Sequence, residues 1–234
     1  VRPGFNTRPS KRNTAPCALL GMGVARRLAP HAPVALLPAD HYIPQDDLFR
    51  EQLREAFATA TAAGGVVTFG VPPSRPETGY GYLQVGGEVR TDGDWRVHTL
   101  DRFVEKPDRG TAEGYLTDGG FLWNSGMFAW RATDLLAEVR RQLPLLFDGV
   151  GAIGDAVGTP DERSALNEIY PRLPKTSVDF GIMESARQCW CVPVDFGWSD
   201  VGSWPALAEV LNADESGNVA RGRTLELDTE GSIL

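Results

Sequence analysis

The sequence predicts an α/β fold in which a mostly parallel, twisted sheet lies between helices. The apolar run at residues 34–37 ends at Pro38, and a short run bounded by a breaker is typical of a fully buried strand in such a sheet. An amphipathic stretch at residues 46–63 and a second apolar run at residues 66–70 follow it. Together they form a strand–helix–strand unit, which implies a parallel pair of strands joined by a right-handed crossover.

The composition is that of a soluble globular protein and argues against two classes of partner. The chain has 234 residues, 42% of them hydrophobic, which suffices for a large domain with a real core. Its net charge of −8 argues against a nucleic acid polymer, whose phosphates require a basic face. No apolar run approaches the roughly 18 residues that a membrane span needs. A homo-oligomer and a monomer both stay open.

The sequence has an odd number of cysteines, Cys17, Cys189 and Cys191. Cys189 and Cys191 would point to the same face of a strand, but no second Cys or His pair accompanies them to complete a metal site. We therefore predict structural thiols in a reducing cytoplasm.

Candidate ligand-binding residues begin with Arg12 and Asn13, which precede a predicted helix. Thr14 is expected to cap this helix, and Pro16 suits its first turn. Because a helix N-terminus is a ready anion site, Arg12 and Asn13 would stand where a phosphate or a base edge is met. A plain helix start is the alternative.

Two glycines lie near the end of a proline-rich loop at residues 71–82. Gly79 and Gly81 would let the backbone approach a ligand that any Cβ would block. The alternative is an ordinary tight turn into the next strand, and the spacing matches no general phosphate-binding loop.

Glu105 and Lys106 follow a strand predicted at residues 95–104. A carboxylate suits vicinal sugar hydroxyls, and an ammonium suits a phosphate. Neighbours on a strand face opposite sides, so the two side chains can form an ion pair only if the strand has already ended. A solvated strand end is the alternative.

Asn124 lies in the middle of an apolar, β-prone stretch at residues 119–130. A buried amide must find partners, because an unpaired one costs about 1–3 kcal/mol. A sugar hydroxyl or a backbone bulge would each supply them, and Gly126 suggests a bulge or a close approach.

Two isolated carboxylates, Asp40 and Asp200, complete the candidates. Asp40 stands just past the first apolar run, at the strand end where open α/β sheets bind ligands. Asp200 lies in a loop rich in Gly and Trp at residues 195–204. A turn-capping aspartate is the alternative for Asp40.

The second half of the chain predicts mainly helices and then short strands. Thr133 and Ser177 are expected to cap helices on either side of a helical insertion at residues 144–174. The predicted domains are residues 1–212 and the start of a β-rich segment at residues 213–234. Its short strands are expected at residues 217–219, 223–228 and 232–234.

Seven stretches, taken together and in order, resemble the bacterial mannose-1-phosphate guanylyltransferases (GDP-mannose pyrophosphorylases). Among them are Thr-Gly-Tyr-Gly-Tyr at residues 78–82, Val-Glu-Lys-Pro at residues 104–107 and Asn-Ser-Gly-Met-Phe at residues 124–128. The seven stretches are residues 12–16, 37–41, 75–82, 103–107, 123–128, 177–184 and 197–204.

The resemblance implies a nucleotidyltransferase α/β fold of Rossmann-like type. The reaction it implies joins GTP and mannose 1-phosphate into GDP-mannose with release of pyrophosphate. In the family, the residues matching Asp40 and Asp200 hold the catalytic Mg²⁺. Glu105 matches a residue that contacts the sugar hydroxyls, and Lys106 one that contacts the sugar phosphate. Asp179 matches a position whose role we leave unassigned.

The resemblance also extends to the rest of the substrate site. Asn124 and Gly79 match residues that line the sugar pocket, and Gly126 belongs to the same motif as Asn124. Arg12 and Asn13 lie in the segment on the guanine side.

The chemistry of the residues agrees with such a reaction. Mg²⁺ takes few carboxylates and leaves room for phosphate oxygens. A phosphate nucleophile is already anionic near neutral pH, because its second pKa is about 6, so no general base is required. An Asp40–His41 dyad is the alternative, although adjacent residues seldom point at the same atom. The other histidines, His31 and His98, lack a convincing partner.

One part of the family's pattern does not occur in the sequence. The family's first strand and its loop Gly-Gly-x-Gly-x-Arg-Leu-x-Pro-Leu-Ser are absent, so we expect an N-terminal truncation. Three hypotheses stay open: the enzyme, a non-catalytic GDP-mannose-binding or regulatory subunit, and a nucleotidyltransferase for another base or sugar. Retention of Asp40, Lys106 and Asp200 favours the first.

Overall fold

Six strands form one mixed sheet in the computed structural model, which describes residues 10–29, 31–89, 96–211 and 213–234. Their order across the sheet is β1-β5-β2-β6-β4-β3, with a further pairing between β3 and β5. The bounds are β1 Pro33–Leu36, β2 Val66–Val71, β3 Tyr82–Val89, β4 Val97–Val104, β5 Phe121–Arg131 and β6 Cys189–Pro193.

The directions of these strands correct the predicted pairing. β1 and β2 run the same way, but each pairs with β5 in antiparallel fashion, so they do not pair with each other. Among the described strands, only β2 and β6 form a parallel pair. The α/β class is confirmed, and β1, β2, β3 and β6 share one direction. The physical reason is β5, an apolar strand of 11 residues whose two edges both need partners.

The first apolar run is less buried than predicted. All four residues of β1 are half-buried, whereas the first five residues of β2 are buried. Among the described strands β1 pairs with β5 alone, and an edge strand is covered less well than a central one. The prediction of a fully buried strand at residues 34–37 is therefore wrong.

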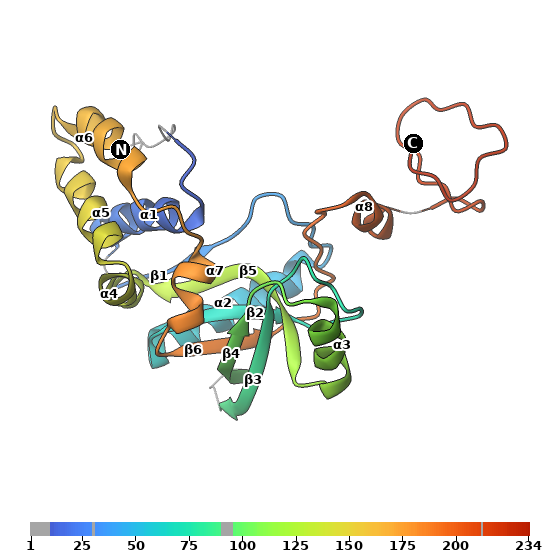
Figure 1. Cartoon of the computed structure of the whole chain (residues 1–234), viewed down its shortest axis with the longest axis horizontal. Coiled ribbons are helices and arrows are strands. Elements are labelled where there is room, and N and C mark those ends of the chain that lie inside the picture. Colours follow the sequence, from blue (N-terminus) through green and yellow to red (C-terminus); the bar gives the residue numbers. More distant parts are fainter. Residues whose placement is uncertain (1–9, 30, 90–95, 212) are drawn as a thin grey trace. The chain divides into compact units, whose positions relative to one another are not determined.

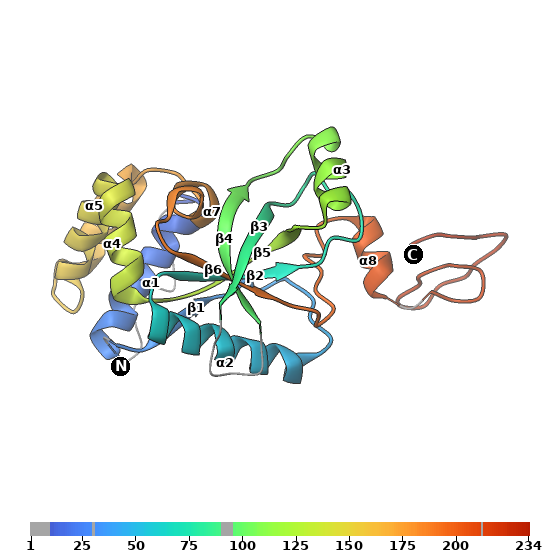
Figure 2. The same cartoon turned by 90° about the horizontal axis from the view of Figure 1, so that it is seen from below.

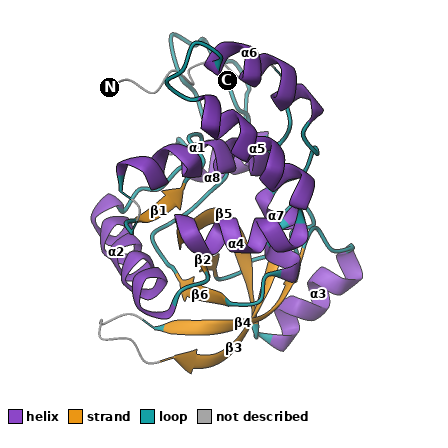
Figure 3. Cartoon of the chain, turned by 90° about the vertical axis from the view of Figure 1, so that its left-hand side faces the viewer, coloured by secondary structure: helices purple, strands orange, loops and turns teal. Residues whose placement is uncertain are grey.

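Helices cover the sheet and also form a group of their own. α1, α4 and α5 pack against one another, and α6 packs on α5 (Figure 1). α2 runs along one side of the sheet (Figure 2), and Figure 3 shows the sheet between α2 and α3. The bounds are α1 Thr14–Leu28, α2 Asp46–Ala63, α3 Arg109–Asp118, α4 Ala132–Gln142, α5 Pro144–Ala156, α6 Glu162–Ile169, α7 Val178–Gly181 and α8 Trp204–Val210, with 3₁₀ turns η1 Tyr170–Arg172 and η2 Met183–Ser185.

The start of α1 is capped by Asn13 and not by Thr14 as predicted, and Thr14 instead bonds to α7. The side chain of Asn13 caps α1, accepting from the backbone N of Thr14 at 2.9 Å. Thr14 does not cap, because its hydroxyl accepts from the backbone N of Val178 at 2.9 Å. The backbone N of Ala15 also donates to the carbonyl of Thr176 at 3.2 Å. The two segments are therefore joined directly.

The other two predicted caps have different outcomes. Ser177 caps α7 as predicted, accepting from the backbone N of Phe180 at 3.0 Å. α4 already begins at Ala132, so Thr133 lies inside its first turn and does not cap it.

The core lies between the sheet and the α1, α4 and α5 group. Trp130 of β5 is fully buried, and its indole N–H lies 2.9 Å from Met22 Sδ of α1. Leu19 of α1, Leu135 of α4 and Leu146 of α5 are fully buried in the same cluster. This packing anchors both α1 and α4. No helix in the described part of the chain is long and apolar enough to cross a membrane.

The chain divides into two compact units. The sheet unit comprises Val1–Leu37 and Glu51–Val194 and contains the whole sheet. The loop unit comprises Pro38–Arg50 and Asp195–Leu234 and contains α8.

The last 22 residues contain one bridge, between Val219 and Ile233, in place of the predicted short strands. Buried Asn218 organises this segment: its Oδ1 accepts from the N of Ser232 at 3.0 Å, and its Nδ2 donates to the carbonyl of Thr229 at 2.7 Å. These side-chain bonds occupy backbone groups that a strand ladder would use. The predicted domain boundary at residue 212 stays a prediction.

Candidate functional site

Asn124 is the centre of a buried polar network in the sheet unit. Its Nδ2 donates to Asp179 Oδ1 at 2.8 Å, and its Oδ1 accepts from the Thr68 hydroxyl and the Gly126 N at 3.2 Å each. Its backbone N donates to the carbonyl of Gly81 at 2.8 Å. Asn124 therefore has the hydrogen-bond partners that a buried Asn requires. They lie on β2, on β5, in the loop before β3 and on α7.

A bulge in β5 creates this arrangement. Thr68 pairs with Phe128 and Gly70 pairs with Asn124, so the register shifts between these two pairs. Gly126 adopts φ +70°, a conformation that suits glycine. Nothing lies within 4 Å of the position of an added Cβ there. The bulge predicted at Gly126 is confirmed, and its reason is the backbone conformation rather than a close approach.

The loop before β3 is held by its own side chains. Glu77 accepts from the N of Gly79 at 2.9 Å and from Arg75 Nε at 3.2 Å. The Arg75 guanidinium lies 5.4 Å from the centroid of the Trp123 ring. A Cβ at Gly79 would lie 3.2 Å from Glu77 Oε1, so Gly79 serves the turn itself. At Gly79 the structure therefore shows the ordinary tight turn that the sequence left open as the alternative to a ligand-binding role.

Gly81 brings the backbone of this loop close to Glu105. A Cβ at Gly81 would lie 2.8 Å from Glu105 Oε2 and 3.4 Å from Asn124 Cβ. The structure thus brings Gly81, Glu105 and Asn124 together, as residues lining one site must be. A side chain at position 81 would displace the Glu105 carboxylate, so this glycine leaves room for Glu105.

Glu105 and Lys106 form an ion pair because the strand has ended. β4 stops at Val104, and Lys106 adopts φ +45°, which turns its side chain back toward its neighbour. Lys106 Nζ lies 3.1 Å from Glu105 Oε1, and the Lys106 side chain is 61% exposed. Such an exposed pair contributes little to stability, so the ammonium stays accessible to an anion.

Asp179 and Glu184 interact with two of the predicted site residues, and the sequence alone reveals a role for neither. Burial raises the pKa of Glu184, and the charge of Glu105 raises it further. Glu184 therefore lies within electrostatic reach of Glu105, and Asp179 is bonded to Asn124. Both belong to the stretch at residues 177–184, but no local pattern in it indicates which side chains turn toward β4 and β5.

Asp40 and Asp200 are brought together in the loop unit. Tyr42 and Ser199 form an antiparallel bridge, with N···O distances of 2.8 and 3.1 Å. The two carboxylates flank His41: burial lowers the pKa of this imidazole, and the charges of Asp40 and Asp200 oppose that effect. The segments that carry the carboxylates therefore run side by side.

His41 is fixed by Trp198 rather than by a catalytic partner. The Trp198 indole Nε1–H, which can only donate, lies 2.9 Å from His41 Nδ1. Nδ1 must then accept, which describes a neutral imidazole. The rings are also in edge contact, with centroids 5.4 Å apart. This geometry argues against the Asp40–His41 dyad.

Asp40 and Asp200 offer carboxylate oxygens, which are the kind of protein ligand that a magnesium ion takes. The described residues contain no cluster of three or more His, Cys, Asp or Glu side chains that could hold a metal. Mg²⁺ is bound through one or two carboxylates, with water and substrate phosphates as its other ligands. Asp200 is oriented by the N of Gly202, which donates to its Oδ1 at 3.0 Å.

Arg12 and Asn13 lie at the start of α1, where the next residue, Thr14, is bonded to Val178, the neighbour of Asp179. Asn13 uses its side chain to cap α1, so its amide oxygen is already engaged. The Nε of Arg12 is buried and finds no hydrogen-bond partner among the described residues. A hydrogen-bond acceptor at this position would satisfy the donor.

The three cysteines are free thiols, and their structural role stays a prediction. Burial raises the pKa of Cys189 and of Cys191 to about 12, so both stay protonated at neutral pH.

Comparison with known proteins identifies a matching family and several similar proteins. The pattern of the family described as nucleotidyl transferase matches residues 1–217. A mannose-1-phosphate guanylyltransferase of Escherichia coli (strain K12) is 40% identical over 230 residues, 97% of this chain and 48% of that protein. The xanthan biosynthesis protein XanB of Xanthomonas campestris (strain B100) is 37% identical over 229 residues, 96% of this chain and 47% of that protein.

A solved structure resembles the chain in fold. It is described as a mannose-1-phosphate geranyltransferase from Thermus thermophilus, with TM-score 0.79 and 36% identity over 92% of this chain and 60% of that one. The chain spans about half the length of the curated relatives it matches. These relatives confirm the resemblance inferred from the seven stretches.

Proposed function

We propose, because this chain belongs to the nucleotidyl transferase family, that it takes part in transferring a guanylyl group from GTP to mannose 1-phosphate. The products are GDP-mannose and pyrophosphate. Relatives named mannose-1-phosphate guanylyltransferase, at 40% and 41% identity, support this choice of substrates.

The observation that carries the proposal is the polar cluster in the sheet unit. Glu105, Asn124 and Gly81 converge, and Lys106 lies beside Glu105. A carboxylate accepts from vicinal hydroxyls and an amide can donate and accept, whereas an exposed ammonium pairs with a phosphate. A hexose 1-phosphate presents this combination of groups.

Each residue has a proposed role in binding the substrates. Glu105 and Asn124 bind and orient the sugar, and Lys106 neutralises its phosphate. Gly79 and Gly126 fix the loop and the bulge that shape this site. Arg12 and Asn13, by the family match, face the guanine side, where the buried Nε of Arg12 would meet an acceptor.

Asp40 and Asp200 are proposed to hold Mg²⁺. Nucleotidyl transferases generally use a divalent metal, and the ion supplies charge neutralisation on phosphate oxygens when bound. These two carboxylates bind it through oxygen, and the bond from Gly202 N keeps Asp200 in place. The neutral His41 beside them adds no positive charge that would compete.

The proposed chemistry needs no protein base. A phosphate oxygen of mannose 1-phosphate attacks the α-phosphorus of GTP, and the bond from that phosphorus to the β-phosphate oxygen breaks. Pyrophosphate carries away the electron pair. The nucleophile is already deprotonated near pH 7, because the second pKa of a phosphate ester is about 6. The protein contributes alignment and charge neutralisation.

The test is release of pyrophosphate from GTP and mannose 1-phosphate in the presence of Mg²⁺. We expect release with this pair, and none when mannose 1-phosphate is omitted. Faster release from UTP and glucose 1-phosphate would favour a nucleotidyltransferase for other substrates. Thermal stabilisation by GDP-mannose without any release would favour the non-catalytic binding subunit.

A further inference from the structure

The segment at residues 178–187 carries two side chains to the proposed sugar site. Asp179 holds the amide of Asn124 at 2.8 Å, and Glu184 lies within electrostatic reach of Glu105. This segment consists of a single turn of helix, α7, a 3₁₀ turn, η2, and irregular backbone. Short turns of this kind do not hold their own conformation, so another element must fix it.

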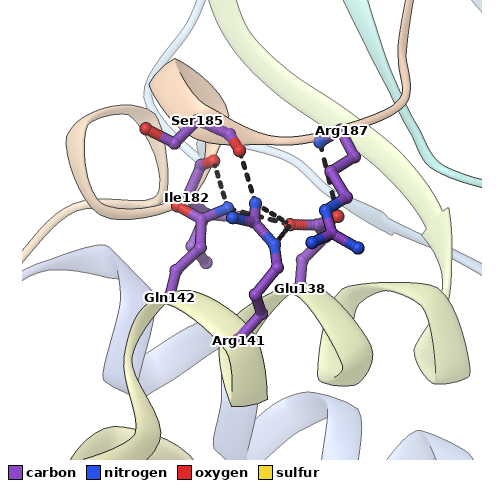
Figure 4. Close-up of polar contacts among 6 residues, drawn as sticks. All are labelled: Glu138, Arg141, Gln142, Ile182, Ser185 and Arg187. Atoms are coloured by element: carbon purple, nitrogen blue, oxygen red, sulfur yellow. Dashed lines mark hydrogen bonds and ion pairs between the residues drawn. The ribbon is translucent and has the colours of Figure 1, made fainter.

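Three side chains on one face of α4 bind the backbone of that segment (Figure 4). Gln142 Nε2 donates to the carbonyl of Ile182 at 3.0 Å, and Arg141 donates to the carbonyl of Ser185. Glu138 Oε1 accepts from the N of Arg187 at 3.3 Å. The three backbone groups lie on both sides of Glu184 in the chain, so its position is fixed from both directions.

Glu138 also holds the other two side chains in place. Its Oε2 accepts from Gln142 Nε2 at 3.0 Å and from Arg141 Nε at 3.1 Å. The Glu138 side chain is 15% exposed and that of Arg141 33%, so this pair is more protected from water than an ordinary surface ion pair. All the groups that face Glu138 in this network are donors, and a carboxylate is the side chain that satisfies them all.

We infer that Glu138, Arg141 and Gln142 are positioning residues, which hold Asp179 and Glu184 at the sugar side of the binding site. The inference rests on the proposed function for the identity of the ligand, but the contacts themselves do not depend on it. None of the three side chains is placed at the substrate; each acts through the backbone of residues 178–187.

The other side of the segment supports the same conclusion. Val178, Ile182 and Met183 are buried, which fixes the depth of the segment. A Cβ at Gly181 would lie 2.7 Å from Thr176 Oγ1 and 3.3 Å from Leu143 Cδ1, so the backbone is pressed close to the end of α4. The apolar contacts set the distance to α4, and the α4 side chains set the orientation.

The test compares Glu138→Gln with Asp134→Asn in the full chain. Asp134 forms an i,i+3 pair with Arg131 at 2.7 Å, also at α4 and similarly buried, and the bonds of this pair join the two side chains to each other rather than to residues 178–187. Each variant removes the charge of one α4 carboxylate that takes part in a half-buried ion pair. The difference between them therefore reports the bonds to the segment rather than the loss of an ion pair.

Two measurements are made at a temperature where both variants stay folded. The dissociation constant for mannose 1-phosphate, measured by titration calorimetry, should rise about tenfold in Glu138→Gln, the effect expected for loss of one well-made contact. It should not change in Asp134→Asn. The carboxyl titration of Glu184, followed by NMR, should move toward the ordinary glutamate range in Glu138→Gln alone, because the burial of Glu184 and its distance from Glu105 both change.

The outcomes separate this inference from the proposed function. Equal affinity in wild type and Glu138→Gln, or an equal loss in both variants, overturns the positioning role. If the wild-type chain does not bind mannose 1-phosphate, the proposed ligand is wrong, and the Glu184 titration alone decides the positioning role. If Glu138→Gln fails to fold, Gln142→Met is used instead, since it removes the bond to Ile182 and keeps the Glu138–Arg141 pair.

Discussion

The two groups of candidate residues, one in each unit, are built in different ways. In the sheet unit, Asn124 lies on a central strand, and hydrogen bonds within the protein occupy both its amide nitrogen and its amide oxygen. In the loop unit, Asp40 and Asp200 lie on irregular segments joined by one isolated bridge, between Tyr42 and Ser199. The first group is organised by the protein alone, whereas the second presents carboxylates that suit an added cation.

This difference has a chemical meaning. A sugar is recognised by groups held in fixed directions, which a bulged strand in a sheet supplies. A Mg²⁺ ion keeps water and phosphate ligands and needs few protein groups. We therefore expect substitutions in the sheet unit to affect folding and binding together. Substitutions of the loop-unit carboxylates should affect metal binding and the activity that depends on it, with little effect on folding.

The largest effect is expected for Asn124→Leu. The change leaves the carboxylate of Asp179, the hydroxyl of Thr68 and the N of Gly126 without the partner that Asn124 provides. We expect the free energy of unfolding to fall by about 3 kcal/mol and mannose 1-phosphate binding to be lost. Urea denaturation and calorimetry measure these quantities. Asn167→Leu, on the exposed face of α6, is the control and should change stability by less than about 0.5 kcal/mol.

The second effect is expected for Asp200→Asn, and it should leave stability almost untouched. An Asn oxygen can still accept from the N of Gly202, so the loop keeps its shape. Affinity for Mn²⁺, used as a paramagnetic probe for Mg²⁺, should fall at least about tenfold, and Mg²⁺-dependent pyrophosphate release should be lost. Asp195→Asn, an exposed carboxylate nearby in the chain, is the control. Unchanged Mn²⁺ relaxation near Asp40 in the Asp200→Asn variant would remove Asp200 from the metal site.

The sequence predicts the parts of the site that depend on local chemistry. The bulge at Gly126, the ion pair of Glu105 with Lys106 once the strand has ended, and the cap at Ser177 follow from residues close together in the chain. The class of fold follows from the same kind of pattern. Asp40 and Asp200 are identified as a pair only through the resemblance, since 160 positions separate them in the sequence.

The features that the sequence does not predict depend on tertiary contacts. Thr14 would cap α1 in isolation, but its hydroxyl is taken by Val178, which is distant in the chain. β5 lies between β1 and β2 in the sheet. Local sequence patterns do not distinguish this strand pairing from the other possible pairings. Glu138 shows no motif at all, because its role depends on which backbone groups lie opposite α4.

The third effect concerns the bulge and is expected to be smaller. Gly126 and Gly120 both have open space where a Cβ would stand, but only Gly126 has a positive φ. Gly126→Ala should therefore cost about 1 kcal/mol of unfolding free energy, whereas Gly120→Ala should be neutral or slightly stabilising. Chemical denaturation of the two variants measures this difference. Because neither new methyl group meets a neighbour, the difference reports backbone strain at position 126 and not side-chain packing. Equal effects would mean that the bulge does not require the left-handed conformation.

The smallest effect is a pH dependence carried by Glu138. Burial alone would raise its pKa, but hydrogen bonds from Gln142, Arg141 and the N of Arg187 outweigh burial and hold the pKa below its ordinary value of 4.5. A depressed carboxyl pKa stabilises the folded state above the ordinary value, and this contribution disappears as the pH falls through the folded-state pKa. The thiol of Cys189, which also faces Glu138, stays protonated in this range because its pKa is about 12.

The measurement is the difference in unfolding free energy between wild type and Glu138→Gln at a series of pH values. The difference should be constant from pH 7 down to about pH 5 and shrink below pH 4.5, because Gln does not titrate. Asp134→Asn gives the comparison on the same helix. A difference that stays constant down to about pH 2.5 would show that the carboxylate charge of Glu138 does not hold residues 178–187. The sugar side of the sheet unit would then depend on its apolar contacts alone.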